Sequence, residues 1–168
     1  MIEVFAKTKK PLERKAELVA KIKKYIMADE IYRELCVEYG RSPEILDGIS
    51  VVFTDEIDVT AKTINAKVFL NSSLIDEKIH IIARYLLHEL THCFQHMEKD
   101  GKPIKKKDKI YLNRPEELEA FQYQIKFDAK KRPDKEVNEY VNNLISYHKI
   151  PKEERKEKKD KLMEKMKK

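Results

Sequence analysis

Apolar residues recur at the spacing of an amphipathic helix in four segments of the chain. The first segment follows Pro11 and ends near Gly40, and we expect a kink or a split at residues 27–30. The second opens at Ser73, which forms a variant of the capping box with Asp76. The pattern therefore predicts helices over residues 11–40, 73–97, 116–130 and 133–148.

Two segments have the composition of β-strands. Residues 49–54 are rich in β-branched and aromatic side chains, and residues 63–71 alternate between apolar and polar positions. The residues between them have room for a third short strand. We therefore predict an α+β fold in which a small mixed or antiparallel sheet packs against one buried helix, with additional helices flanking it.

The helix over residues 73–97 is apolar nearly all round, which is typical of a buried helix. It nevertheless contains the sequence H-E-x-x-H, formed by His88, Glu89 and His92. The histidines lie four residues apart, so they share one face and can bind a single metal ion. Glu89 lies beside that face, where a carboxylate can take a proton from water on the metal. Burying these polar groups without a shared partner would be costly, so the pattern predicts a zinc hydrolase.

A catalytic zinc typically has three protein ligands, and the sequence leaves the third one open. His96 follows His88 by eight residues, which separates them by roughly 12 Å along the helix axis and excludes a shared ion. Cys93 points about 100° away from His92 around the helix and is expected in the core. The better candidates are three carboxylates on the next predicted helix: Glu116, Glu117 and Glu119.

H-E-x-x-H followed about 25 residues later by E-x-x-A resembles the gluzincin zinc metallopeptidases, a group that includes small intracellular proteases acting on phage repressors. The resemblance covers roughly residues 63–125 and implies a zincin-like fold. It implies Zn²⁺ ligation by His88, His92 and Glu117, with Glu89 as the general base. Many relatives have Asp or Asn directly after the alanine, where this chain has Phe121. The hydrogen-bond partner of a ligand histidine therefore has three candidates: Asn113, Gln124 and Asp128.

The predicted function is hydrolysis of a peptide bond by a zinc-dependent peptidase that acts on a protein or peptide substrate. The candidate hydrogen-bond donors for the oxyanion of such a reaction are Tyr111, Tyr147 and His148. The strand over residues 64–70, directly before the H-E-x-x-H helix, would suit pairing with an extended peptide.

Charge and composition add a second hypothesis. The chain carries 36 basic and 30 acidic residues, a net charge of +6 with mixed signs. Basic residues concentrate in the loop between Lys102 and Lys109 and in residues 151–168, which hold nine Lys or Arg against five Asp or Glu. The alternative function is therefore a zincin-fold binding module for a protein or nucleic-acid partner, in a phage or defence context, with little or no hydrolase activity.

The organisation expected from the sequence is one metallopeptidase domain over residues 1–150, followed by a charged, lysine-rich tail over residues 151–168. The tail is expected to be a solvated helix or disordered. Cys36 and Cys93 are the only cysteines, and no apolar run has the length of a membrane span. These features favour a cytoplasmic protein without membrane contact, and they leave the oligomeric state open.

Overall fold

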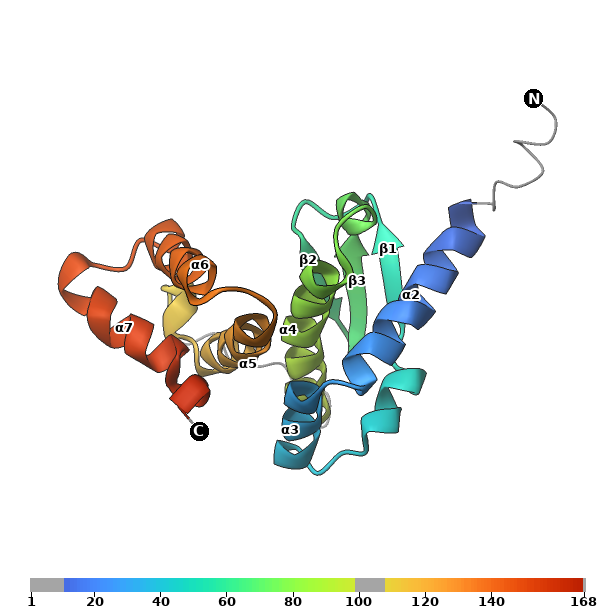
Figure 1. Cartoon of the computed structure of the whole chain (residues 1–168), viewed down its shortest axis with the longest axis horizontal. Coiled ribbons are helices and arrows are strands. Elements are labelled where there is room, and N and C mark those ends of the chain that lie inside the picture. The colour runs from blue at the N-terminus through green and yellow to red at the C-terminus, as the bar shows by residue number, and fades with distance from the viewer. Residues whose placement is uncertain (1–10, 99–107, 168) are drawn as a thin grey trace.

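The computed structural model describes residues 11–98 and 108–167 (Figure 1). Within these ranges the chain forms an α+β fold, as the sequence predicts. The regular elements are α2 (Pro11–Met27), α3 (Glu30–Glu38), β1 (Val51–Thr54), β2 (Ala61–Ile64), β3 (Lys67–Asn71), α4 (Ile79–Glu98), α5 (Pro115–Lys131), α6 (Asp134–Tyr147) and α7 (Arg155–Leu162). Short 3₁₀ turns lie at Pro43–Gly48, Ser72–Leu74, Tyr111–Asn113, Lys152–Glu154 and Glu164–Lys167.

The sheet is mixed and has the strand order β1-β3-β2. β1 runs parallel to the central strand β3, and β2 runs antiparallel to it. We predicted residues 63–71 as one strand, and this prediction is wrong. Asn65 and Ala66 both adopt positive φ, at 51° and 60°, and reverse the chain between β2 and β3. Such turns are usually signalled by glycine, which is absent here.

Of two predicted helix boundaries, the structure confirms one and contradicts the other. The expected break at residues 27–30 is confirmed, because α2 ends at Met27 and the Asp29 carboxylate accepts a hydrogen bond from the Ile31 amide at the start of α3. The prediction of a capping box at Ser73 is wrong. The Asn71 side chain instead caps the 3₁₀ turn by accepting from the Ser73 amide, and α4 begins six residues later, at Ile79.

The first hydrophobic core lies between the sheet and helices α2, α3 and α4 (Figure 1). α4 contributes a series of fully buried residues to it: Ile82, Ala83, Leu86, Leu87, Leu90, Cys93 and Phe94. Tyr123 and Phe127 reach the same core from α5. The buried character predicted for the H-E-x-x-H helix is therefore confirmed.

A second core covers the opposite side of α5 and is closed by α6 and α7. Residues 151–167 belong to this part of the fold, since Leu162 is fully buried and the Gln122 amide donates to the Lys161 carbonyl at 2.8 Å. Lys158 Nζ donates to the Leu112 carbonyl at 3.3 Å. α5 is thus shared by both cores. None of the described helices has the length and apolar character required to cross a membrane.

Replacing Leu162 by Ala tests the packing of α7 on this second core. Because Leu162 is fully buried, we expect Leu162→Ala to lower the free energy of unfolding by about 2–5 kcal/mol in denaturant titrations. Val37→Ala is the control, since Val37 is 81% exposed and its truncation should change stability by no more than about 0.5 kcal/mol. Equal effects of the two substitutions would show that α7 does not pack as described.

Candidate metal centre

Helices α4 and α5 form the most extensive contact between elements in the described chain. At one end Arg84 Nη1 meets Asp128 Oδ2 at 3.3 Å, and at the other end Gln95 Nε2 donates to the Glu116 carbonyl at 3.0 Å. These contacts occur in opposite order along the two helices, so α4 and α5 run antiparallel. The middle of each helix therefore faces the middle of the other.

This pairing brings together three of the residues that the sequence singled out. Nitrogen or oxygen donor atoms of His88, His92 and Glu117 all lie within 4.8 Å of one another, and such a group can hold a metal ion. Glu117 Oε1 is 3.5 Å from His88 Nε2 and forms a closer ion pair with His92 Nε2. The geometry distinguishes Glu117 from Glu119, which instead contacts Gln95 at 3.0 Å.

The electrostatics of the group suit a cation. Burial acts to raise the pKa of Glu117, but the two imidazoles outweigh it and hold this pKa well below its usual range. Burial acts to lower the pKa of His92, yet the hydrogen bond and charge of Glu117 raise it to about 9. Glu117 Oε1 is buried and has no partner among the described residues other than these two imidazoles. Two imidazoles and one carboxylate are a donor set that zinc and related divalent ions bind.

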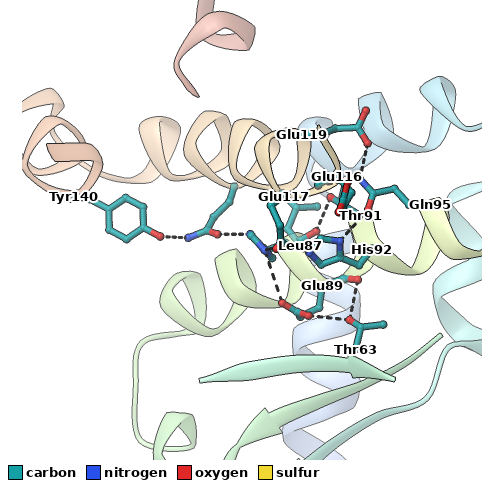
Figure 2. A network of polar contacts seen from close by, with 12 residues as sticks. Thr63, Leu87, Glu89, Thr91, His92, Gln95, Glu116, Glu117, Glu119 and Tyr140 are labelled. Atoms are coloured by element: carbon teal, nitrogen blue, oxygen red, sulfur yellow. Dashed lines mark hydrogen bonds and ion pairs between the residues drawn. The ribbon is translucent and has the colours of Figure 1, made fainter. Parts of the chain in front are cut away.

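Glu89 lies directly beside this group (Figure 2). Its Oε2 atom is 4.0 Å from His88 Nε2, while its Oε1 atom accepts a hydrogen bond of 2.8 Å from the Thr63 hydroxyl of β2. The Thr63 hydroxyl also lies 3.2 Å from the Glu89 carbonyl oxygen. One carboxylate oxygen is thus held by the sheet and the other is directed to the metal-binding group. Sequence reasoning missed Thr63, because its contact crosses 26 residues.

The Nδ1 atom of each histidine faces a glutamine. His88 Nδ1 is 2.8 Å from Gln124 Oε1, and His92 Nδ1 is 2.8 Å from Gln95 Oε1. Gln124 was one of three candidates for this role, and its contact with His88 is confirmed. Gln95 was missed, although its position three residues after His92 on the same helix was a signal that could have found it.

The other two candidate partners have different roles. Asp128 forms ion pairs with Arg84 and Arg132, so its carboxylate is engaged away from the histidines. Asn113 lines a separate small pocket beside α7. Phe121 packs against His88, with their ring centroids 4.4 Å apart, and supplies an apolar wall where many gluzincins have Asp or Asn.

The remaining singled-out side chains lie around the group. His96 lines the neighbouring cleft and does not belong to the metal-binding group, and Cys93 is buried with its thiol pKa raised to about 12 by burial. Tyr111 also lines the cleft, and His148 stacks on the Tyr111 ring with centroids 4.9 Å apart. Tyr147 is 80% exposed and turned to solvent.

A cleft of about 700 Å³ opens onto the metal-binding group. Its lining includes residues of β2 and its flanking loops, together with Tyr111 and Arg114. Glu89, His92 and Glu117 line the same cleft. Most of the lysine-rich loop named in the sequence, residues 102–107, lies outside the described residues.

No protein-family model, curated protein or solved structure matches the chain.

We expect Glu117 to be necessary for metal binding and its neighbour Glu116 to be dispensable. We expect wild-type protein to bind one equivalent of Zn²⁺ per chain and Glu117→Ala to lose most of that binding, because two histidines remain without the third ligand. Glu116→Ala is the matched control, since its side chain lies outside the group. Metal content after dialysis, measured by mass spectrometry, tests this. Loss of zinc in Glu116→Ala with retention in Glu117→Ala would assign the third ligand differently.

Metal affinity is also expected to depend on pH. Because the pKa of His92 is raised to about 9 in the metal-free protein, its imidazole holds a proton at neutral pH that a metal ion must displace. Apparent Zn²⁺ affinity should therefore rise about tenfold per pH unit between about pH 6.5 and 8.5 and level off near the folded-state pKa. Titrations against a chelator of known pH dependence measure this. An affinity that is flat over the range would contradict the expectation.

Proposed function

We propose that this protein is a zinc-dependent peptidase of the gluzincin type with a zincin-like fold. The observation that carries the proposal is the convergence of His88, His92 and Glu117 within 4.8 Å, with Glu89 directly beside them in the lining of a cleft. The two elements of the H-E-x-x-H and E-x-x-A pattern lie on separate helices, and nothing but the packing of α4 on α5 brings them together.

In this proposal His88, His92 and Glu117 hold Zn²⁺, which when bound supplies a Lewis acid and lowers the pKa of a bound water toward about 7. Glu89 is the general base, which takes a proton from the attacking water and delivers it to the leaving amine. The hydrogen bond from Thr63 to Oε1 orients the Glu89 carboxylate so that Oε2 faces the reacting centre. Thr63 is thus a positioning residue for this base.

Tyr111 is the donor that we propose for the oxyanion. It lines the cleft, and burial, reinforced by the charge of Glu117, raises the pKa of its hydroxyl, which therefore stays protonated at neutral pH. A protonated phenol can donate to the oxygen on which negative charge develops. His148 lies behind Tyr111 and orients its ring by stacking, while Tyr147 is not needed for this step.

An extended peptide is proposed to bind along the outer edge of β2. The sequence hypothesis placed this pairing on residues 64–70, most of which belong to the central strand β3, both of whose sides are occupied. β2 pairs only with β3 among the described strands, and Ala61, Lys62 and Thr63 line the cleft. Backbone pairing at this edge would place a scissile carbonyl over the metal-binding group.

The alternative function that we propose is a binding module, and for either function we propose a cytoplasmic setting. Cys36 and Cys93 are both buried free thiols, as a reducing environment would allow. A nucleic-acid partner has little support among the described residues, because α7 and its neighbouring turns mix acidic with basic side chains.

Glu89→Gln tests the peptidase proposal directly. We expect zinc-loaded wild-type protein to generate new peptide termini in a tryptic digest of a bacterial proteome, detected by mass spectrometry. Glu89→Gln should retain zinc but cleave about 10²–10⁴-fold more slowly, because the general base is lost.

Val37→Ala is a suitable control, since Val37 is 81% exposed and does not line the cleft. Undiminished cleavage by zinc-loaded Glu89→Gln would refute the proposed mechanism. Absence of any cleavage by zinc-loaded wild-type protein would contradict the peptidase proposal and favour the binding module.

A further inference from the structure

The amide of Gln95 can adopt only one orientation in this structure. Its Nε2 atom lies 3.0 Å from the Glu116 carbonyl oxygen and 3.0 Å from Glu119 Oε1. Both partners are acceptors without a hydrogen to donate, so the NH₂ group of the amide must face them. The opposite end of the amide, Oε1, then faces His92 Nδ1 at 2.8 Å (Figure 2). An acceptor in that position requires a hydrogen on Nδ1.

Glu119 is itself held in place from a third helix. The Tyr39 hydroxyl, at the end of α3, donates a hydrogen bond to Glu119 Oε1, the same atom that accepts from Gln95. Burial and the hydrogen bond to Glu119 raise the pKa of Tyr39, so its hydroxyl keeps the proton that it donates. A continuous hydrogen-bonded series therefore extends from Tyr39 through Glu119 and Gln95 to His92.

The glutamine beside His88 is constrained differently. Gln124 Oε1 faces His88 Nδ1 at 2.8 Å, and its Nε2 atom donates to the Tyr140 hydroxyl at 2.6 Å. A hydroxyl can donate as well as accept, so Tyr140 would also satisfy a carboxylate oxygen at position 124.

We propose that Gln95 is a positioning residue that keeps the hydrogen of His92 on Nδ1 and thereby presents Nε2 to a metal ion, and that only an amide can do this at position 95. At position 124 a carboxylate can replace the amide. The proposal rests on the metal site of the proposed function. It assigns a role to three residues that the H-E-x-x-H and E-x-x-A pattern does not include: Gln95, Glu119 and Tyr39.

The physical basis is the count of donors and acceptors. A carboxylate introduced by Gln95→Glu would accept from His92 Nδ1, but its second oxygen would face the Glu116 carbonyl and the Glu119 carboxylate with no hydrogen between them. A buried acceptor without a donor is costly, and like charges in contact add to that cost. The same substitution at position 124 leaves every acceptor with a donor.

The experiment compares Zn²⁺ affinity of matched isosteric variants, measured by competition with a chelator. We expect Gln95→Glu to weaken Zn²⁺ binding about 10–100-fold, because repulsion from the Glu116 carbonyl and the Glu119 carboxylate displaces the new carboxylate from His92 Nδ1, and a ligand histidine without its hydrogen-bond partner typically loses affinity by this factor. Gln124→Glu should bind Zn²⁺ as tightly as wild-type protein or more tightly, because a carboxylate strengthens the ligand. Similar affinities for the two variants, or the opposite order, would overturn the proposal.

The double variant Gln95→Glu/Glu119→Gln separates this role from a general loss of folding. An amide nitrogen at position 119, in the place of Glu119 Oε1, can donate both to the new carboxylate at position 95 and to the Tyr39 hydroxyl, which can accept as well as donate. We expect the double variant to recover at least part of the Zn²⁺ affinity lost in Gln95→Glu. No recovery in a double variant whose circular dichroism matches that of wild-type protein would overturn the proposal.

Nitrogen-15 NMR of the zinc-loaded protein provides a direct signature. The His92 ring should show a hydrogen on Nδ1 and the metal on Nε2, whereas the reverse assignment would contradict the proposed role of Gln95. Failure of wild-type protein to bind Zn²⁺ would instead refute the metal site of the proposed function, so the two failures are distinguishable.

Discussion

The buried contact between α4 and α5 determines how the candidate metal ligands meet. The ion pair between Arg84 and Asp128 at one end and the hydrogen bonds of Gln95 at the other hold the two helices in one antiparallel register. Removing one member of such a buried pair leaves an uncompensated charge and typically costs about 3–5 kcal/mol. A change of register by one turn would move Glu117 about 5.4 Å along the helix axis, too far to share an ion with His88.

Polar groups concentrate at this contact because α5 lies between two hydrophobic cores. Each core holds one face of α5 in place, so the α5 side chains between these two faces have little freedom to move. Buried imidazoles, carboxylates and amides are tolerable there only because each has a partner or converges on a common point. The tight packing around α5 therefore fixes the positions of the polar atoms. α7 contributes to this packing by closing the second core.

Local patterns predicted the fold class, the buried H-E-x-x-H helix and the helix that carries Glu117. They did not predict the hairpin, because the turn at Asn65 and Ala66 depends on positive φ angles that tertiary pairing of β2 with β3 stabilises. They also placed the start of α4 six residues early, since the polar side chains before it form a 3₁₀ turn. Both errors arose where short polar segments have several local solutions of similar energy.

For the candidate site, the sequence by itself determined the chemistry within one helix: two histidines on one face and a glutamate beside them. Helical geometry makes that relation independent of the rest of the molecule. The spacing left three neighbouring carboxylates open, and only the family resemblance favoured Glu117. The tertiary structure alone brought Glu117 to the histidines, Thr63 to Glu89 and Gln124 to His88. These contacts cross 25 to 36 residues of chain. Their distances are set by how the helices and the sheet pack, which no local pattern encodes.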